Sequence, residues 1–236
     1  MTPPAIVCDL ADLVLGRCCL GCGAPGPGLC AACVDGLRGT PLAANRTIVG
    51  PPVIAATTYS GLGRTALLAY KKQGYRSLAA PLGWLLADAI WAAMRATDAE
   101  ACVIVPVPGH RRSRRGFEAL GDVVREARRA LAGAGVAVRE ARLLRVDADY
   151  AALKGLGRAA RRQQVAGAFR AVQTSSTPGC VIVLDDVITT GATAAEAVAA
   201  LERASIGVSA VATIAATITP DRWATSPAPA PATHLR

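Results

Sequence analysis

The chain has 236 residues, of which 52% are apolar and 4% aromatic, and it carries a formal net charge of +9. This length suits one sizeable α/β domain with a small appendage, and the apolar content supplies a real core, which excludes a chain without packed structure. The basic charge favours acidic partners, namely phosphorylated small molecules, nucleic acid or an anionic surface, without choosing among them.

The chain shows the pattern of neither a secretory signal nor a membrane span. Its first residues, Met1–Leu15, are interrupted by prolines and aspartates and lack a basic start. The longest apolar stretch, Leu78–Met94, contains Pro81 and Asp88 and is short for a bilayer, so we predict a core helix there. We therefore expect no integral membrane segment, a cytoplasmic protein, and cysteines that are metal ligands or buried thiols rather than disulfides.

Five of the eight cysteines lie close together near the N-terminus, in the pattern Cys19-x-x-Cys22, seven residues, Cys30-x-x-Cys33. Two such pairs predict a tetrahedral structural Zn²⁺ site, which would supply folding free energy on the order of 10 kcal/mol. A disulfide pair and a CxxC redox motif are the alternatives. Cys18 could replace Cys19 as a ligand, but the CxxC spacing favours Cys19.

Composition divides the chain into three parts. Residues 1–39 hold a short lead-in and the four-cysteine zinc-binding knuckle, and residues 40–216 form the main domain, which begins with a proline-rich linker over Thr40–Pro52. Residues 217–236 are a Pro/Ala-rich tail with too little apolar surface to fold, so we expect it to be disordered.

Strands and helices alternate along the main domain. The predicted strands are Val53–Tyr59, Cys102–Val107, Ala141–Val146, a strand from Val181, and Val208–Ala215. The predicted helices are Gly61–Gln73, Leu78–Arg95, Phe117–Leu131 and Ala194–Ala204, and a polar loop covers Asp147–Arg162. This alternation predicts an α/β fold with a parallel sheet, in which ligands bind at the carboxyl ends of the strands.

One stretch, residues 181–193, combines an apolar strand, two carboxylates and a small-residue loop before a helix. The carboxylates are Asp185 and Asp186, and the loop residues are Thr189, Thr190, Gly191, Ala192 and Thr193. A loop at a helix N-terminus offers free N–H groups and the positive end of the helix dipole, which favour an anion. The carboxylates suit sugar hydroxyls, so we predict a sugar phosphate site. The alternative is a buried strand with a polar turn, in which the acidic pair has a structural role.

A second strand-end loop offers a site for a polyanion. It comprises Pro106, Val107, Pro108 and Gly109, and four arginines follow within residues 111–115. Guanidinium groups bind phosphate through charge-assisted bidentate contacts, so a polyanion is the predicted ligand. The alternative is a solvated basic turn. His110 could be a general base or a phosphate donor, but a loop hydrogen bond is the commoner role.

These motifs resemble those of known families. Residues 181–193 resemble the phosphoribosyl-pyrophosphate (PRPP) motif of type I phosphoribosyltransferases, and the whole chain resembles the ComF (ComFC-like) family of competence-associated proteins. The matching segments, in family order, are Cys19/Cys22/Cys30/Cys33, Tyr70-Lys71 with Gly74, Pro106-Val107-Pro108, Arg115-Gly116-Phe117, Arg158 with Arg161-Arg162, Val165–Phe169 and 184–193. The departures are Glu118-Ala119 where the family has Asn-Gln, no Gln in Tyr150–Leu153, and Gln164 for Asn.

The resemblance implies a zinc knuckle joined to a type I phosphoribosyltransferase fold. It implies that Asp185 and Asp186 lie by the ribose hydroxyls and that Thr189–Thr193 binds the 5-phosphate. The basic and pyrophosphate residues would be the 106–109 turn with Lys71, Arg111, Arg115 and Arg158, and Mg²⁺ would accompany PRPP.

Two functions follow from this resemblance. The first is an enzyme that transfers phosphoribosyl from PRPP to an unidentified acceptor and releases pyrophosphate. The second is a non-catalytic single-stranded-DNA-binding protein of natural transformation that retains a PRPP pocket and works with the DNA-uptake machinery. Net charge and the arginine clusters favour DNA binding, whereas the low aromatic content leaves few stacking platforms.

Overall fold

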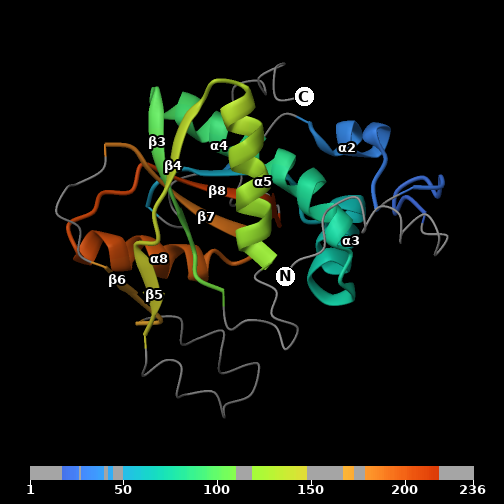
Figure 1. Cartoon of the computed structure of the whole chain (residues 1–236). Coiled ribbons are helices and arrows are strands. Elements are labelled where there is room, and N and C mark those ends of the chain that lie inside the picture. The colour runs from blue at the N-terminus through green and yellow to red at the C-terminus, as the bar shows by residue number, and fades with distance from the viewer. Residues whose placement is uncertain are drawn as a thin grey trace, which may run out of the picture.

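The computed structural model describes residues 18–26, 28–39, 42–44, 50–109, 119–147, 167–172 and 179–217 (Figure 1). The predicted lead-in, the loop from residue 148 to 162 and the tail from residue 218 lie outside these residues. Figure 1 shows helices α2 (Ala31–Leu37) and α3 (Gly61–Leu68) at one end of the described fold and the two-stranded sheet of β5 and β6 at the other.

A six-stranded sheet in the order β1-β2-β8-β7-β3-β4 forms the centre of the main domain. All neighbouring pairs are parallel except the edge pair of β1 and β2. The strands are β1 Leu42–Ala44, β2 Val53–Thr58, β3 Ala101–Pro106, β4 Ala137–Glu140, β7 Val181–Ile188 and β8 Ala210–Ala216. Because parallel strands are covered on both faces, the central ones are nearly continuous apolar runs, and β8 is buried throughout. The predicted α/β class with a parallel sheet is confirmed.

Helices cover both faces of the sheet, and two hydrophobic clusters lie beneath them. Ile182 and Leu184 pack into one cluster with α4 (Ala79–Ala96) and α5 (Ala119–Gly133). Val181 and Val183 pack into the other with α8 (Ala192–Arg203). This alternation follows from the period of two along a strand, which sends successive side chains to opposite faces.

The long apolar helix lies in the core. Among the described residues one helical segment, Arg76–Ala96, is long and apolar enough to cross a membrane by length and composition. However, 72% of its most apolar window is buried inside the fold, where α4 contacts α5, β2 and β8. The helical segment is slightly longer than the predicted helix Leu78–Arg95, and its burial agrees with the predicted core helix.

Several short elements differ from the prediction. The linker contains the edge strand β1, and the segment Ala141–Val146 forms a strand only from Leu144. Strands β4 and β6 (Phe169–Ala171) were not predicted. Their three or four residues carry no apolar run, and they are held by pairing: β4 extends the main sheet, and β6 pairs antiparallel with β5 (Leu144–Val146).

The predicted helix over Gly61–Gln73 changes its winding partway. Helix α3 ends at Leu68, and the π-helix η1 (Ala69–Gln73) continues it and ends at Gly74, whose φ of 77° is left-handed. Glycine takes this conformation without the steric cost that a Cβ atom imposes. Short π-helical segments occur frequently at functional sites, and η1 carries Lys71.

Candidate functional site

The two predicted strand-end loops lie next to each other, because β3 and β7 are neighbouring parallel strands. Pro106 is the register partner of Leu184, the residue before the acidic pair. The Val107 N–H continues the ladder by donating to the Leu184 carbonyl oxygen at 2.8 Å. The Pro106–Gly109 turn therefore leaves β3 beside the acidic pair of the neighbouring strand.

The threonine loop forms the N-terminal cap of α8. Thr189 and Thr190 are exposed, and Gly191 occupies the N-cap position with a left-handed φ of 80°. The helix begins at Ala192, two residues before the predicted start at Ala194, so Thr193 belongs to its first turn. The twelve-residue helix directs its free N–H groups and its positive dipole end toward this loop, an arrangement that can bind an anion.

Asp185 and Asp186 are the fifth and sixth residues of β7, directly after four fully buried residues, and both are half-buried. The Asp186 N–H donates to Asp185 Oδ1 at 2.8 Å. Burial raises the pKa of the Asp185 carboxyl, and the neighbouring Asp186 charge raises it further; the hydrogen bond and Lys71 act in the opposite direction, and the pKa reaches about 7. At neutral pH both the neutral and the ionised form of the Asp185 carboxyl are therefore populated.

Lys71 reaches the acidic pair from a distant part of the chain. Its ammonium group forms a salt bridge with Asp186 Oδ2, and both side chains are partly exposed. The structure thus places Lys71 at the acidic pair. Arg111, Arg115 and Arg158, as well as His110, lie outside the described residues.

A cavity of about 500 Å³ opens beside the turn. It shares Pro106, Val107 and Pro108 with the turn, and Arg142 and Arg145 also line it. Neither of these two arginines was predicted as a site residue. They flank the apolar Leu143-Leu144 pair within the predicted strand Ala141–Val146, which is a weak signal for a ligand-facing residue.

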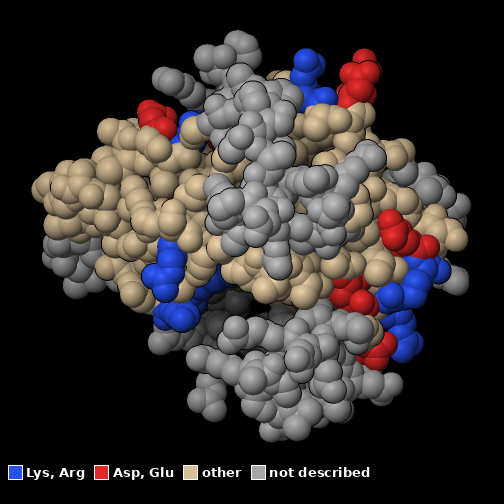
Figure 2. All heavy atoms as spheres, turned by 180° about the vertical axis from the view of Figure 1, so that it is seen from behind, with Lys and Arg blue, Asp and Glu red and all other residues tan. Residues whose placement is uncertain are grey.

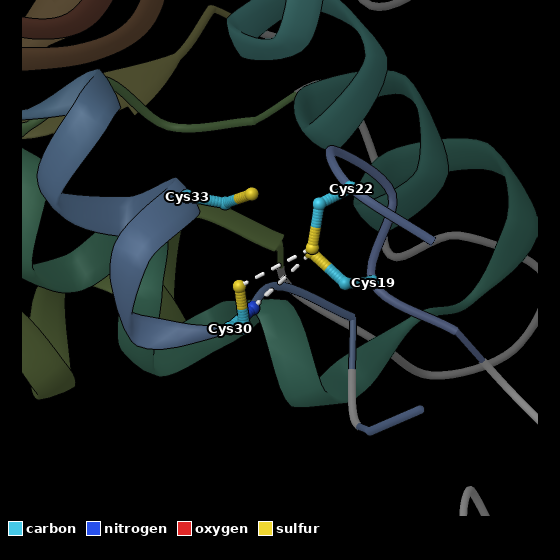
Figure 3. A group of neighbouring side chains, drawn as sticks. All are labelled: Cys19, Cys22, Cys30 and Cys33. Atoms are coloured by element: carbon cyan, nitrogen blue, oxygen red, sulfur yellow. Dashed lines mark hydrogen bonds between the residues drawn. The ribbon is translucent and has the colours of Figure 1, made fainter. Parts of the chain in front are cut away.

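The four predicted zinc ligands lie together. The four Sγ atoms all lie within 4.8 Å of one another; they belong to Cys19, Cys22, Cys30 and Cys33. Figure 3 shows the four thiols around a common space. A tetrahedral zinc ion with Zn–S bonds of about 2.3 Å needs sulfur atoms about 3.8 Å apart, which agrees with this spacing. Cys18 is exposed and not part of the group. The cluster could therefore hold zinc through the predicted set.

Backbone N–H groups already favour thiolate in this cluster. Cys30 and Gly21 donate N–H groups to Cys19 Sγ at 3.3 and 3.4 Å (the Cys30 bond is drawn in Figure 3). Burial raises the pKa of the Cys19 thiol, but backbone hydrogen bonds from Cys30, Cys22 and Gly21 and the Cys33 thiol lower it to about 6. Hydrogen bonding to Cys19 and Cys30 raises the pKa of Cys33 to about 12. A bound divalent cation would stabilise all four thiolates together.

The charged side chains on the rear of the described fold form small groups rather than a stripe. Figure 2 shows Lys and Arg side chains in separate clusters, several of them next to Asp or Glu, with uncharged surface between. Ion pairs such as Arg170–Asp147 and Arg203–Glu196 show the same mixing of charges. On the described part of this face, the charges do not form the continuous basic track that single-stranded nucleic acid needs. The arginines of 111–115 and 158–162 lie outside the described residues.

Comparisons with known proteins give little further information. The chain matches no family model and no curated protein. Among solved structures, it is similar to the hypoxanthine-guanine phosphoribosyltransferase from Schistosoma mansoni in complex with IMP, with 18% sequence identity and a TM-score of 0.32. This match covers 64% of the present chain and 61% of that enzyme. At this TM-score the match carries no argument about function.

Proposed function

We propose that the protein binds PRPP and transfers its phosphoribosyl group to an acceptor, with release of pyrophosphate. One observation carries the proposal: the Pro106–Gly109 turn leaves β3 beside the acidic pair of β7, with Pro106 in register with Leu184. A substrate with one phosphate, two free ribose hydroxyls and a pyrophosphate needs three kinds of contact within one small site. These neighbouring loops offer all three.

In this proposal each part of the substrate has its own partners. The 5-phosphate binds the loop from Thr189 to Thr193, where the N–H groups of α8 and the threonine hydroxyls can donate hydrogen bonds. The ribose hydroxyls donate to the carboxylates of Asp185 and Asp186. The pyrophosphate lies along the Pro106–Gly109 turn, and Arg111, Arg115 and Arg158 are proposed to bind it.

Catalysis would consist of positioning and charge stabilisation. The bond between the ribose C1 and the pyrophosphate oxygen breaks, its electron pair leaves with pyrophosphate, and a lone pair of the acceptor forms the new bond to C1. The carboxylates of Asp185 and Asp186 stabilise the positive charge that develops on the ribose. Asp185 and Asp186 would hold Mg²⁺ near the substrate, and the bound ion would offset charge on the pyrophosphate. The carboxylates fit this role because hard cations prefer oxygen-rich surroundings.

The cysteine cluster is proposed to hold a structural zinc ion. Residues 1–39 would then form the knuckle and residues 40–216 the phosphoribosyltransferase-like domain, followed by the tail. The order of the motifs supports membership of the ComF family, and with it a role for a cytoplasmic protein in DNA uptake.

The proposal is tested by calorimetric titration with PRPP and Mg²⁺ and by a pyrophosphate-release assay against a panel of bases and single-stranded DNA. We expect saturable PRPP binding, which the double variant Asp185→Asn/Asp186→Asn weakens strongly. Glu202→Gln is the matched control, because Glu202 is an exposed carboxylate at the far end of α8. Equal affinity in the double variant and the wild type would overturn the assignment of the ribose contacts. Release of pyrophosphate with one acceptor only would identify that acceptor.

A further inference from the structure

The cysteine cluster touches the helix that leads to the sugar phosphate site. A Cβ atom added at Gly21 would lie 2.6 Å from the Cys33 sulfur and 2.9 Å from Leu62 Cδ2. Gly21, within the first CxxC turn, therefore lies between a predicted zinc ligand and the first turn of α3, where a Cβ atom has no room. Leu62, Cys30 and Cys33 are partly buried, and each of them packs against the larger hydrophobic cluster.

From Leu62 a continuous helix leads to Lys71. Ala69, at the junction of α3 and η1, has φ −60° and ψ −45°, so the backbone remains helical where the winding changes. Gly63 fixes the start of this helix to the sheet, because a Cβ atom there would lie 2.8 Å from the Thr58 carbonyl oxygen at the end of β2. Two turns later, the Lys71 ammonium group pairs with Asp186.

The other side of the knuckle is anchored to α4. Arg38, the C-cap of α2, donates from Nε and Nη2 to the two Asp88 oxygens at 2.7 Å each, and both side chains are largely buried. The knuckle thus lies against α4 at one side and against α3 at the other. The CxxC turns themselves contribute little apolar surface. Among the described residues between 18 and 30, the buried apolar ones are Cys19 and Leu29. Their position against Leu62 therefore depends on what holds the four thiols together.

We propose that the metal-loaded cysteine cluster positions Lys71 beside Asp186 through α3, so that metal occupancy and PRPP binding are coupled. Leu62 and Lys71 act as positioning residues: Leu62 receives the contact of the CxxC turn, and Lys71 delivers its charge to the acidic pair. The inference rests on the proposed function, because it takes PRPP as the ligand of that site. Coupling is reciprocal, so PRPP must also strengthen zinc binding by the same factor.

The experiment uses the full chain, zinc-loaded or stripped by a chelator, and titrates it with PRPP and Mg²⁺. In the wild type we expect stripping to weaken PRPP binding about tenfold, within the range usual for coupled sites. Lys71→Met should bind PRPP weakly in both forms and lose the difference between them. Lys72→Met is the matched control, since Lys72 is an exposed neighbour in the same π-helix, and it should respond to stripping like the wild type.

A second readout does not depend on PRPP binding by stripped protein. Zinc transfer to a chromogenic chelator should be slower with PRPP and Mg²⁺ present in the wild type and unaffected by them in Lys71→Met. Leu62→Ala, which keeps all four thiols, should lower PRPP affinity in the zinc-loaded form. Because it is measured in the zinc-loaded form, this variant tests the proposed coupling even if the stripped protein unfolds.

The possible failures can be told apart. If zinc-loaded wild type does not bind PRPP, the proposed function fails. If it binds PRPP, but stripping weakens wild type and Lys71→Met by the same factor, the proposed coupling through Lys71 is wrong. Undiminished PRPP affinity in Leu62→Ala would overturn it equally, because the contact with the CxxC turn would then have no effect at the site.

Discussion

Asp185→Asn should stabilise the protein in the absence of ligand and Mg²⁺. The pKa of Asp185 rises from 3.8 to about 7 on folding, first through burial and then through the Asp186 charge. The folded state therefore binds the proton more tightly than the unfolded state, and stability is lost as pH rises from about 4 to about 7. Asparagine carries no ionisable group, and its side-chain oxygen can keep the bond from the Asp186 N–H.

The size of the effect follows from the two pKa values. Relative to low pH, where Asp185 is protonated in both states, linkage gives a cost in unfolding free energy of about 2 kcal/mol at pH 5 and about 4 kcal/mol at pH 8. The gain in unfolding free energy of Asp185→Asn over wild type should grow across this interval by the difference between these two costs. Above pH 8 the gain should level off, because Asp185 is then ionised in both states.

Urea unfolding followed by circular dichroism at pH 5, 6, 7 and 8 measures this difference, in zinc-containing buffer without phosphate. Glu202→Gln serves as the control, because it removes an exposed carboxylate from the same domain and should not reproduce the pH-dependent gain. A difference between Asp185→Asn and wild type that stays constant with pH would refute the reasoning. So would an asparagine variant that is less stable than wild type at pH 8.

Three further predictions concern binding and packing. The PRPP affinity measured by calorimetry should rise between pH 6 and pH 8 as Asp185 ionises. Asp185→Asn should lack the part of this rise that is due to Asp185 and keep the part that is due to ionisation of PRPP itself. Arg38→Met should cost about 3–5 kcal/mol of unfolding free energy, because it leaves the buried Asp88 unpaired, and the double variant with Asp88→Leu should recover most of it in urea titrations. Cys19→Ser should lower the zinc content measured by atomic absorption, whereas Cys18→Ser should not.

The sequence predicted the local parts of the site because each part has a local cause. An apolar run followed by carboxylates, threonines and Gly191 predicted a strand, a loop and a helix start, and the structure has all three. The spacing of the cysteines likewise predicted the cluster that the structure contains. The start of α8 was placed two residues late, because Ala192 and Thr193 were assigned to the loop rather than to the first helical turn.

The relations between distant parts were not predictable from local patterns. That β3 lies beside β7 depends on strand pairing across the whole sheet, and the sequence by itself does not state the strand order. The salt bridge between Lys71 and Asp186 was not predicted either, because it depends on how α3 and η1 pack against the sheet. Strand β4 was missed because its half-exposed Ala-Val-Arg-Glu sequence is stabilised by pairing with β3 rather than by its own pattern.

The acidic pair makes little sense as a purely structural feature. Burial after four fully buried residues disfavours the ionised form of Asp185, and the adjacent Asp186 charge disfavours it further, so that the pKa of Asp185 is raised. A structural role would be met by one carboxylate paired with Lys71, since Asp186 alone forms that salt bridge. Departures from local stability of this kind concentrate at functional sites, where a ligand compensates for them. Ribose hydroxyls would do so by donating to both carboxylates, and for this reason the stability gain of Asp185→Asn and its loss of PRPP binding should occur in the same variant.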